Sequence, residues 1–419
     1  MDIVLGTTDA TIDSVFVCDA ELLPDTERAL VAQSSIRMLM KVPEVVASGF
    51  SDGILLVDHT FKIFKERLSL LTVAVHDAMQ QGHMVAFGPT SHEDTASVCS
   101  GLCIVKVTIN KILTCIYTNT MPEGWSALLT ASILLKYTPI AQSVATAGAK
   151  VVLLCLPTVL ADHAQALPNG AIASKLVVKQ PGRIVKKTCY AHVVRDIRTN
   201  RGKLKNKDLL DGILCDVAYI HECPYLELLH ELADADDEDG PMADANGVVG
   251  LGPMIGLFIQ KYTLMGEDEF VDYMVKHQLY HLWSRGHGMP GEATDTNTLE
   301  RQHRDLKTPD KYDSVEGFAT VLKNQGTAGT RVSRDSKEVA QIVEPSNKHW
   351  AKAQGMLTRG HLNLSLAKDD LVIIPSEVLI KDHVPKDVTT MAGCVLPPPL
   401  PLSFPPSLSP PPLPSLLAP

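Results

Sequence analysis

The chain has 419 residues, of which 45% are hydrophobic, and its formal net charge is −10. This length and hydrophobic content predict one large or two ordinary domains with a real core. The acidic balance excludes polyanion binding through bulk charge, so any such binding needs a local basic surface.

Cysteine usage and the N-terminal sequence predict a soluble protein of an intracellular, reducing compartment. Nine cysteines at irregular spacing do not resemble a disulfide framework. The start, MDIVLGTTDATID, has neither the basic nor the apolar region of a secretory signal. The most apolar windows, WSALLTASILLKY and AKVVLLCLP, are too short to span a membrane, and we expect no membrane partner.

The first elements are a helix and then a set of strands. Residues 26–50 have a helical pattern broken at Pro43, within an N-terminal flanking segment at 1–50. Strand patterns separated by short connections then predict an antiparallel meander, at 53–64, 68–76 and 83–89. A helix should follow, opened by a capping box that starts at Ser91.

The middle of the chain has a weaker pattern. At 101–157 the apolar content is high, but helical and strand periods compete, and we interpret this stretch as an insertion of unclear structure. A strand should then end at Asp162 and pass into a helix. Another strand, 183–189, should run into a basic helix.

The later part of the chain is predicted to be mostly helical. A helical insertion should occupy about 205–290, and its helix at 269–283 carries an apolar face. The sequence NTLERQHRDLK then predicts one more helix. A core at 51–325 would thus precede a C-terminal flanking segment, 326–395.

The last segment, 396–419, is rich in proline and carries no charge. Such a composition samples polyproline II and stays unfolded. It could be a ligand for an aromatic-groove domain, or read-through or mispredicted coding sequence.

Charge is unevenly distributed along the chain. Residues 175–207 hold eleven Lys and Arg against a single acid, Asp196. An acidic run follows at 231–239. The pattern predicts a local basic surface beside a solvated acidic loop.

Asp58 lies in the middle of GILLVDHTFKIF, a segment that otherwise has the pattern of a buried strand. A buried carboxylate is costly unless a metal, a cation or several donors meet it. The simpler interpretation is that Asp58 ends the strand and caps a turn.

Asp58, Asp162 and Glu300 come from three separate predicted elements. Carboxylate oxygens are the ligands that Mg²⁺ prefers, and two such ions can hold the attacking and leaving oxygens of a phosphoryl displacement. Spacing alone does not select this triple, because the chain has 48 Asp and Glu residues. Asp162 could also cap a helix, and an acid such as Glu300 is favoured in any first helical turn.

Five stretches in chain order carry a family resemblance: VDHTFKIF, VAVHDAMQQGHMVAFGPTSHEDT, LADHAQAL, KKTCYAHVVRDI and MPGEATDTNTLERQHRDLK. Together they resemble the MULE (Mutator-like element) transposase domain, which has a DDE catalytic core of the RNase H-like fold. The similarity covers roughly residues 40–325, with a gap across 101–157. The resemblance implies an α/β fold with a mixed sheet and a mostly helical insertion before the last catalytic helix.

The resemblance also implies an activity and its residues. The family's catalytic, metal-binding aspartates match Asp58 and Asp162, and its glutamate matches Glu300, preceded by Asn297. The implied reaction is Mg²⁺- or Mn²⁺-dependent DNA cleavage and strand transfer at transposon ends. DNA is then the partner and the nucleus the location, and the family allows a homo-oligomer.

Some features depart from the family pattern. His163 replaces a small residue, Thr296 replaces the first of two asparagines, and neither a zinc-finger nor a SWIM pattern flanks the core. The alternative is therefore an inactive, truncated or domesticated remnant that binds DNA or another partner.

The remaining motif residues have simpler structural interpretations. The family's C-x-x-H pair falls on Cys189 and His192, too few ligands for a zinc site, so a buried cysteine and a hydrogen-bonded histidine are favoured. The family's H-E-x-T motif falls on His92 and Glu93, which are expected to order a helix start.

Basic residues near the predicted site are candidates for contact with the DNA backbone. They lie on the basic helix and on the face of Glu300: Arg195, Arg198, Arg201, Arg304 and Lys307. Such contacts would be independent of base sequence and sensitive to salt. The ordinary alternative is a solvated helix surface with local ion pairs.

Overall fold

The computed structural model describes residues 10–340, except for several short ranges. Those ranges are 24–27, 49–52, 61–67, 123–124, 147–154, 163, 180–183, 224, 233–247, 288–293 and 307–314. The proline-rich tail, Lys307, His163 and most of the acidic run lie outside the described residues. The side chains of Asn297 and Arg304 also lie outside the description.

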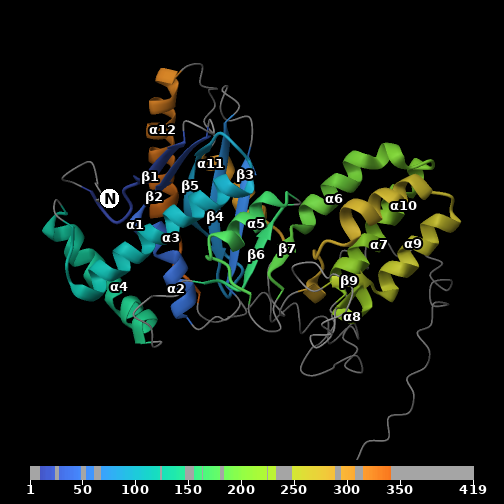
Figure 1. The fold of residues 1–419 in the computed structure, drawn as a ribbon, viewed down its shortest axis with the longest axis horizontal. Coiled ribbons are helices and arrows are strands. Elements are labelled where there is room, and N and C mark those ends of the chain that lie inside the picture. The colour runs from blue at the N-terminus through green and yellow to red at the C-terminus, as the bar shows by residue number, and fades with distance from the viewer. Residues whose placement is uncertain are drawn as a thin grey trace, which may run out of the picture. The chain divides into compact units, whose positions relative to one another are not determined.

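The described strands form one large mixed sheet and a separate two-stranded ribbon (Figure 1). The large sheet has seven strands in the order β1-β2-β5-β4-β3-β6-β7. Their bounds are β1 Phe16–Leu23, β2 Arg28–Ser34, β3 Ile54–Thr60, β4 Ser69–His76, β5 Gly82–Thr90, β6 Thr158–Ala161 and β7 Lys186–Thr188. The ribbon pairs β8 (His230–Leu232) with β9 (Val248–Leu251).

The helices fall into two sets, those that pack on the sheet or on its covering helices and those of the region between β7 and α11. The first set is α1 Ile36–Leu39, α2 Lys41–Ala47, α3 Thr95–Thr118, α4 Ala127–Thr146, α5 Ala166–Ala173, α11 Asn297–Leu306 and α12 Val315–Arg334. The second set is α6 Tyr190–Thr199, α7 Leu210–Glu222, α8 Leu226–Leu229, α9 Pro253–Leu264 and α10 Asp268–Met274.

Strand directions confirm the predicted meander. β3 pairs antiparallel with β4, and β4 pairs antiparallel with β5. The turn between β4 and β5 is closed by Asp77, whose carboxylate accepts hydrogen bonds from the backbone N–H groups of Met79 and Gln81, at 2.9 Å each. On the other side of β3, β6 and then β7 run parallel, so the sheet is mixed as expected.

The helix predicted at 26–50 is wrong in its first part. β2 (Arg28–Ser34) is a strand that pairs with both β1 and β5. The helical structure begins only after Ser35, whose side chain accepts the N–H of Met38 and caps α1. The edge of β5 offers hydrogen-bond partners to this segment. Helical propensity is a local property that does not include such pairing, so the segment forms a strand instead of a helix.

The segment of unclear pattern at 101–157 contains two long helices. α3 is capped by Asp94, which accepts the Ser97 N–H, so the cap is Asp94 rather than the expected Ser91. It ends at Asn119 in the left-handed region, with a φ of 54°. By length and composition α3 could cross a membrane, but its buried side chains pack in the main core. Those contacts explain why it is apolar on more than one face.

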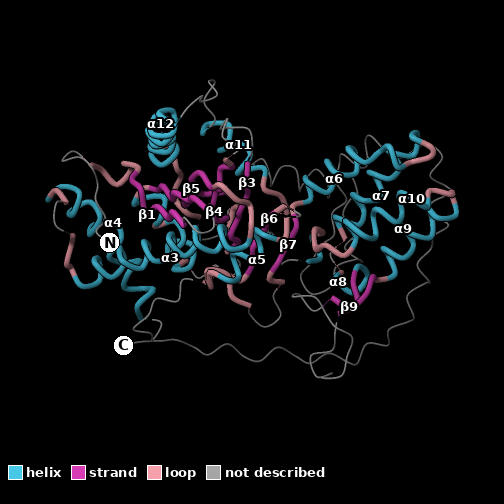
Figure 2. The backbone as a smooth tube through the Cα atoms, turned by 45° about the horizontal axis from the view of Figure 1, so that its top comes forward, coloured by secondary structure: helices cyan, strands magenta, loops and turns pink. Residues whose placement is uncertain are grey.

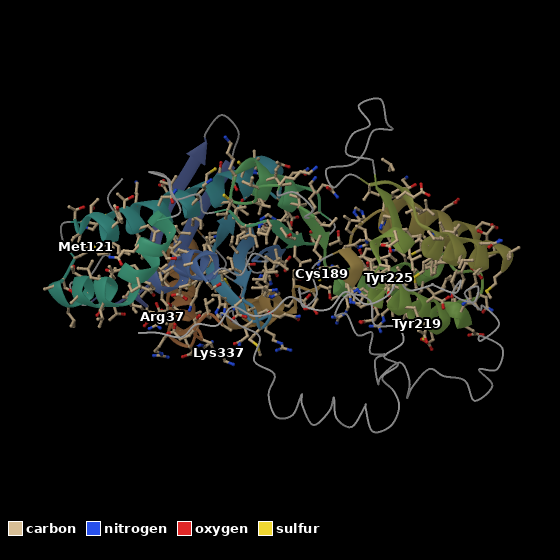
Figure 3. The ribbon with its side chains drawn as sticks, turned by 90° about the horizontal axis from the view of Figure 1, so that it is seen from below. Arg37, Met121, Cys189, Tyr219, Tyr225 and Lys337 are labelled. Carbon is tan, nitrogen blue, oxygen red and sulfur yellow. The ribbon has the colours of Figure 1, made fainter. Side chains whose placement is uncertain are left out.

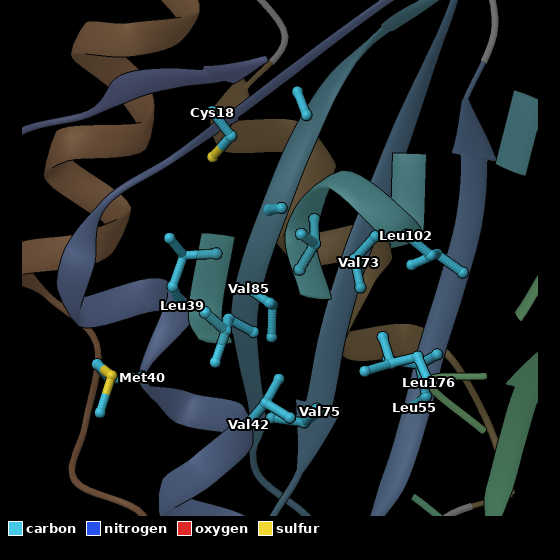
Figure 4. Close-up of a cluster of buried hydrophobic side chains, with 14 of the residues drawn as sticks. Cys18, Leu39, Met40, Val42, Leu55, Val73, Val75, Val85, Leu102 and Leu176 are labelled. Carbon is cyan, nitrogen blue, oxygen red and sulfur yellow. The ribbon is translucent and has the colours of Figure 1, made fainter. Parts of the chain in front are cut away.

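Alternation along β3 divides the core into two faces. Leu55 and Val57 belong to the main cluster, together with side chains of α1, α2, α3 and α5 (Figure 4). Ile54 and Leu56 point to the opposite face, where they pack with Leu299 of α11. Figure 2 shows α11 and α12 on one side of the strands and α3 and α5 on the other.

The helices after β7 have a core of their own. Its largest members include Trp283, Tyr262 and Phe270, and it extends from α6 to α10. The predicted helix at 269–283 is α10, which continues as a π-helical turn at Val275–Leu279. The expected helical insertion between the last strand and the Glu300 helix is thus present in the described residues.

Replacing Leu299 by Ala should destabilise the fold. The side chain is fully buried between α11 and the sheet, and a buried Leu→Ala change costs about 2–5 kcal/mol. The matched control is Leu135→Ala on α4, where the side chain is 86% exposed and the change should stay within about 0.5 kcal/mol. Urea unfolding measures both, and equal losses would contradict the placement of α11.

Candidate functional site

Asp58 lies near the end of β3, on the face of the sheet that α11 covers. Side chains alternate between two faces along a strand, so Asp58 lies on the same face as Ile54 and Leu56, which pack against Leu299. Its residue exposure is 5%. The carboxyl is therefore part of a buried strand and does not cap a turn, contrary to the simpler interpretation of the sequence.

Asp162 follows β6, which lies next to β3. The parallel register pairs Leu56 with Leu160, and two further residues along each strand bring Asp162 opposite Asp58. Side chains alternate between the two faces of a sheet. Each aspartate lies two residues after a member of the Leu56–Leu160 pair, which packs against Leu299, so both aspartates belong to the α11 face. Asp162 Oδ1 accepts the N–H of Ala164 at 2.8 Å, so it orders the turn before α5, but it does not cap that helix as its simpler interpretation expects, because the N-cap residue is Gln165.

Glu300 comes to the same face in the first turn of α11. Its backbone N–H donates to the carbonyl of Thr296 at 3.2 Å. Glu300 Oε1 lies 3.9 Å from Nε2 of the buried His192, and the Glu300 side chain is 47% exposed. The three carboxylates thus differ in accessibility, with Asp58 innermost and Glu300 open to solvent.

The electrostatics of Asp58 show how near the other two carboxylates lie. Burial, followed by repulsion from Asp162 and Glu300, raises the pKa of Asp58 from 3.8 to about 8. Attraction to Arg195 lowers it in part. Without a counter-charge from outside the chain, three acids in this arrangement resist full ionisation.

His303 is a site residue that the sequence analysis missed. It is buried, and its Nδ1 lies 3.7 Å from Asp58 Oδ2. Its Nε2 is hydrogen-bonded to the hydroxyl of Thr72, the residue paired with Asp58 across β3 and β4. Thr72 Oγ1 in turn donates to the Asp58 carbonyl at 3.0 Å. The spacing of three residues between Glu300 and His303 is the signal that could have identified it.

The carboxylate oxygens of this site are chemically suited to bind a hard cation. Three carboxylates, one of them buried and disfavoured as an anion, are the ligand type that Mg²⁺ and Mn²⁺ bind. Among the residues that the structure describes, however, no group of three or more His, Cys, Asp or Glu side chains is gathered closely enough to enclose a metal ion. The three acids face one region without forming a closed cage.

The remaining motif residues surround this site at different distances. Glu93 Oε1 lies 2.9 Å from Nδ1 of His59, the neighbour of Asp58, so Glu93 contacts β3 rather than capping α3. His92 is exposed, and its ring contacts Ser91. Asn297 begins α11.

Cys189 is fully buried between β7 and α6. Burial raises the pKa of its thiol, an effect that hydrogen bonds from Thr296 oppose. His192 is buried as well, and burial followed by Arg195 lowers its pKa. The buried cysteine agrees with the simpler interpretation of the pair, but the expected hydrogen bond of the histidine is not found at Nδ1 of His192, which is buried without a partner in the described structure.

The basic surface is exposed, and several of its cations lie near acids. Arg195, Arg198 and Arg201 are exposed on α6 and the turn after it. Lys203 and Lys205 instead face acids of α10, with Lys203 Nζ 3.6 Å from Glu269 Oε1 and Lys205 Nζ 3.5 Å from Asp268 Oδ2. Arg195 also has an acid nearby, since its Nε lies 3.8 Å from Asp196 Oδ1.

Buried Glu267 holds the basic loop in place. Its carboxylate accepts the backbone N–H groups of Lys205 and Asn206 at 2.7 and 2.9 Å. The loop after α6 is thereby tied to the start of α10. Arg195, which influences both Asp58 and His192, connects this surface to the carboxylates.

Comparison of the chain with protein-family models and with curated protein sequences gives no match. The family resemblance therefore depends on the sequence motifs, and the site depends on its own geometry.

The raised pKa of Asp58 predicts a pH-dependent stability. Between pH 4 and pH 8 the folded protein keeps the Asp58 proton and the unfolded chain loses it, so stability falls as pH rises through this range. The slope from this group is at most about 1.4 kcal/mol per pH unit. Asp58→Asn should remove that contribution and be more stable than wild type at pH 8.

Urea unfolding in the presence of a metal chelator, from pH 5 to pH 9, measures this dependence. Asp272→Asn, at an exposed position on α10, is the matched control and should keep the wild-type dependence. An unchanged slope in Asp58→Asn would show that this carboxyl is already ionised in the folded protein.

Proposed function

We propose that the chain is a MULE-type DDE transposase with an RNase H-like core, which cleaves and transfers DNA strands with Mg²⁺ or Mn²⁺. The observation that carries the proposal is the buried Asp58, with Asp162 and Glu300 near enough to raise its pKa. The three residues come from β3, the end of β6 and α11, elements far apart in the chain. A buried acid with two further acids from separate elements beside it indicates a functional site, because such an arrangement destabilises the fold on its own.

The sheet supports the RNase H-like part of the proposal. The strands β5-β4-β3-β6-β7 have the meander on one side of β3 and two parallel strands on the other. This is the arrangement that the family resemblance implies for the core. A helical insertion before α11 agrees with the same expectation.

The chemistry follows from what each residue contributes. A divalent metal, when bound, would neutralise the acids and favour attack by water or a DNA 3′-hydroxyl on a phosphodiester. Asp58, Asp162 and Glu300 are the residues that would hold it. Asp58 is shielded from water and held near His303, whereas the half-exposed Glu300 would be accessible to a substrate.

The exposed arginines would hold the DNA backbone beside the acids. Arg195 is close enough to Asp58 to lower its pKa, so a phosphate bound by Arg195 would lie near the site. Contacts of arginines with phosphates carry no sequence information, which predicts binding independent of sequence. A nuclear location and self-association remain expectations from the family.

A second candidate function is DNA or partner binding without catalysis. The observation that favours it is that the described side chains do not form a closed metal cage. The departures at His163 and Thr296 also fit a degenerate element.

Purified protein should nick and join DNA in the presence of Mg²⁺ or Mn²⁺. Asp58→Asn and Glu300→Gln should each reduce the rate by about 100-fold or more, the scale for removal of one electrostatic group from an active site. The control Asp272→Asn should retain the wild-type rate. Gel analysis of a nicked plasmid and of joined oligonucleotides gives both rates.

Calorimetric titration with Mn²⁺ separates the two candidate functions. A catalytic site should bind Mn²⁺ and lose this binding in Asp58→Asn. Equal nicking in wild type and in both variants would remove the three acids from the mechanism, and absent Mn²⁺ binding would favour the binding protein.

The arginine surface gives a separate prediction. Changing Arg195, Arg198 and Arg201 to Ala should weaken binding of unrelated duplexes about equally and reduce the salt slope by about 1 for each phosphate that the protein no longer neutralises. The control pair, Lys203→Ala with Lys205→Ala, should have a smaller effect because acids of α10 already face these lysines. Fluorescence anisotropy at several salt concentrations measures both, and an unchanged slope in the triple variant would identify an ordinary solvated surface.

A further inference from the structure

Cys189 joins the two elements that carry the outer acids of the site. Its backbone N–H donates to the carbonyl of Ala161, the residue before Asp162, at 2.8 Å. Its sulfur accepts two hydrogen bonds from Thr296, from the backbone N–H at 3.2 Å and from the hydroxyl at 3.3 Å. The same residue is thus bonded to the end of β6 and to the start of α11.

Thr296 connects Cys189 to Glu300 through backbone hydrogen bonds. The Thr296 carbonyl accepts the N–H groups of Leu299 at 2.8 Å and of Glu300 at 3.2 Å, which forms the first turn of α11. Thr296 is fully buried, and its hydroxyl donates to this sulfur away from water. A buried hydroxyl or N–H left without an acceptor is costly, and this cost holds Thr296 in one position.

The neighbours of Cys189 reinforce the same junction. The backbone N–H of Tyr190 donates to the Thr294 carbonyl at 2.9 Å. The Tyr190 ring stacks on His221, with centroids 3.6 Å apart, and His192 lies beside Glu300. Figure 3 shows Cys189 where the sheet-containing part of the chain meets the helices that follow β7. The part of the chain that leads from the helical insertion into α11 is therefore hydrogen-bonded to segment 189–192.

We propose that Cys189 is a positioning residue whose sulfur, by accepting both hydrogen bonds of Thr296, sets the position of Glu300 relative to Asp162. This inference rests on the proposed function for its catalytic meaning, but its structural content can be tested alone. The competing interpretation treats Cys189 as a small apolar side chain that only fills the space beside Leu56 and Leu299. The first interpretation requires a hydrogen-bond acceptor at position 189, whereas the second requires only a small side chain that fills the space.

Three variants separate the acceptor from the volume. Cys189→Ala removes the acceptor, and Cys189→Ser restores one at nearly the same position. Thr296→Val removes the hydroxyl donor while it leaves Cys189 intact, and so serves if Cys189→Ala fails to fold. Hydrogen exchange by mass spectrometry, on peptides that span Thr296–Glu300, reports the first turn of α11, and peptides from α3 serve as the internal control.

Cys189→Ala and Thr296→Val should speed exchange of the Leu299 and Glu300 amides without a change in α3, and Cys189→Ser should restore most of the protection. Equal protection in wild type and Cys189→Ala would overturn the inference. So would a loss in Cys189→Ser as large as in Cys189→Ala, because volume rather than the acceptor would then decide.

Mn²⁺ affinity connects the position of Glu300 to the site. Cys189→Ala should weaken Mn²⁺ binding about 10-fold, the lower end of the effect of removing a group that orients a metal ligand, and Cys189→Ser should bind more tightly than Cys189→Ala. Unchanged affinity in Cys189→Ala would overturn the positioning role at the metal site. A wild-type protein that binds no Mn²⁺ would instead overturn the proposed function, and the exchange measurement would still decide the role of Cys189.

Discussion

The arrangement of the site depends on one buried carboxyl, Asp58, on the α11 face of the central strand. Its neighbours on that face, Ile54 and Leu56, pack under Leu299, so the acid is placed where the apolar contact between sheet and helix ends. Burial and two nearby acids keep its pKa near 8. The fold therefore holds, at this one place, a group whose anion needs a positive partner.

The surrounding residues keep α11 at a defined distance from the sheet. At its start, Thr296 is bonded to the sulfur of Cys189. Three residues beyond Glu300, His303 reaches Thr72 on β4 and approaches Asp58. An apolar contact alone would allow α11 to slide along the sheet, because hydrophobic attraction has no direction. These polar contacts restrict it.

The helical region after β7 contributes position and charge. Its separate core lets it return the chain to Thr294 and α11 as one packed unit. It also orders the loop after α6 through Glu267 and pairs two of the loop lysines with acids of α10. The arginines of α6 and of the turn after it form a narrow surface that begins beside the acids. Arg195 connects this surface to Asp58, whose pKa it lowers in part.

The sequence by itself determined the meander, the two later strands and the helices at α6 and α11, because alternation and helical periodicity are local properties. The three acids were named through the family resemblance, because spacing alone did not select them. It did not determine β2, which became a strand through pairing with β5, nor α4 and the length of α3 beyond its predicted start, because their apolar faces are explained only by contacts with the rest of the core. It named Cys189 and His192 without a role and missed His303. Only the tertiary structure brought Cys189 to Thr296 and His303 to Asp58, because contacts between residues more than one hundred positions apart leave no periodic signal in the chain.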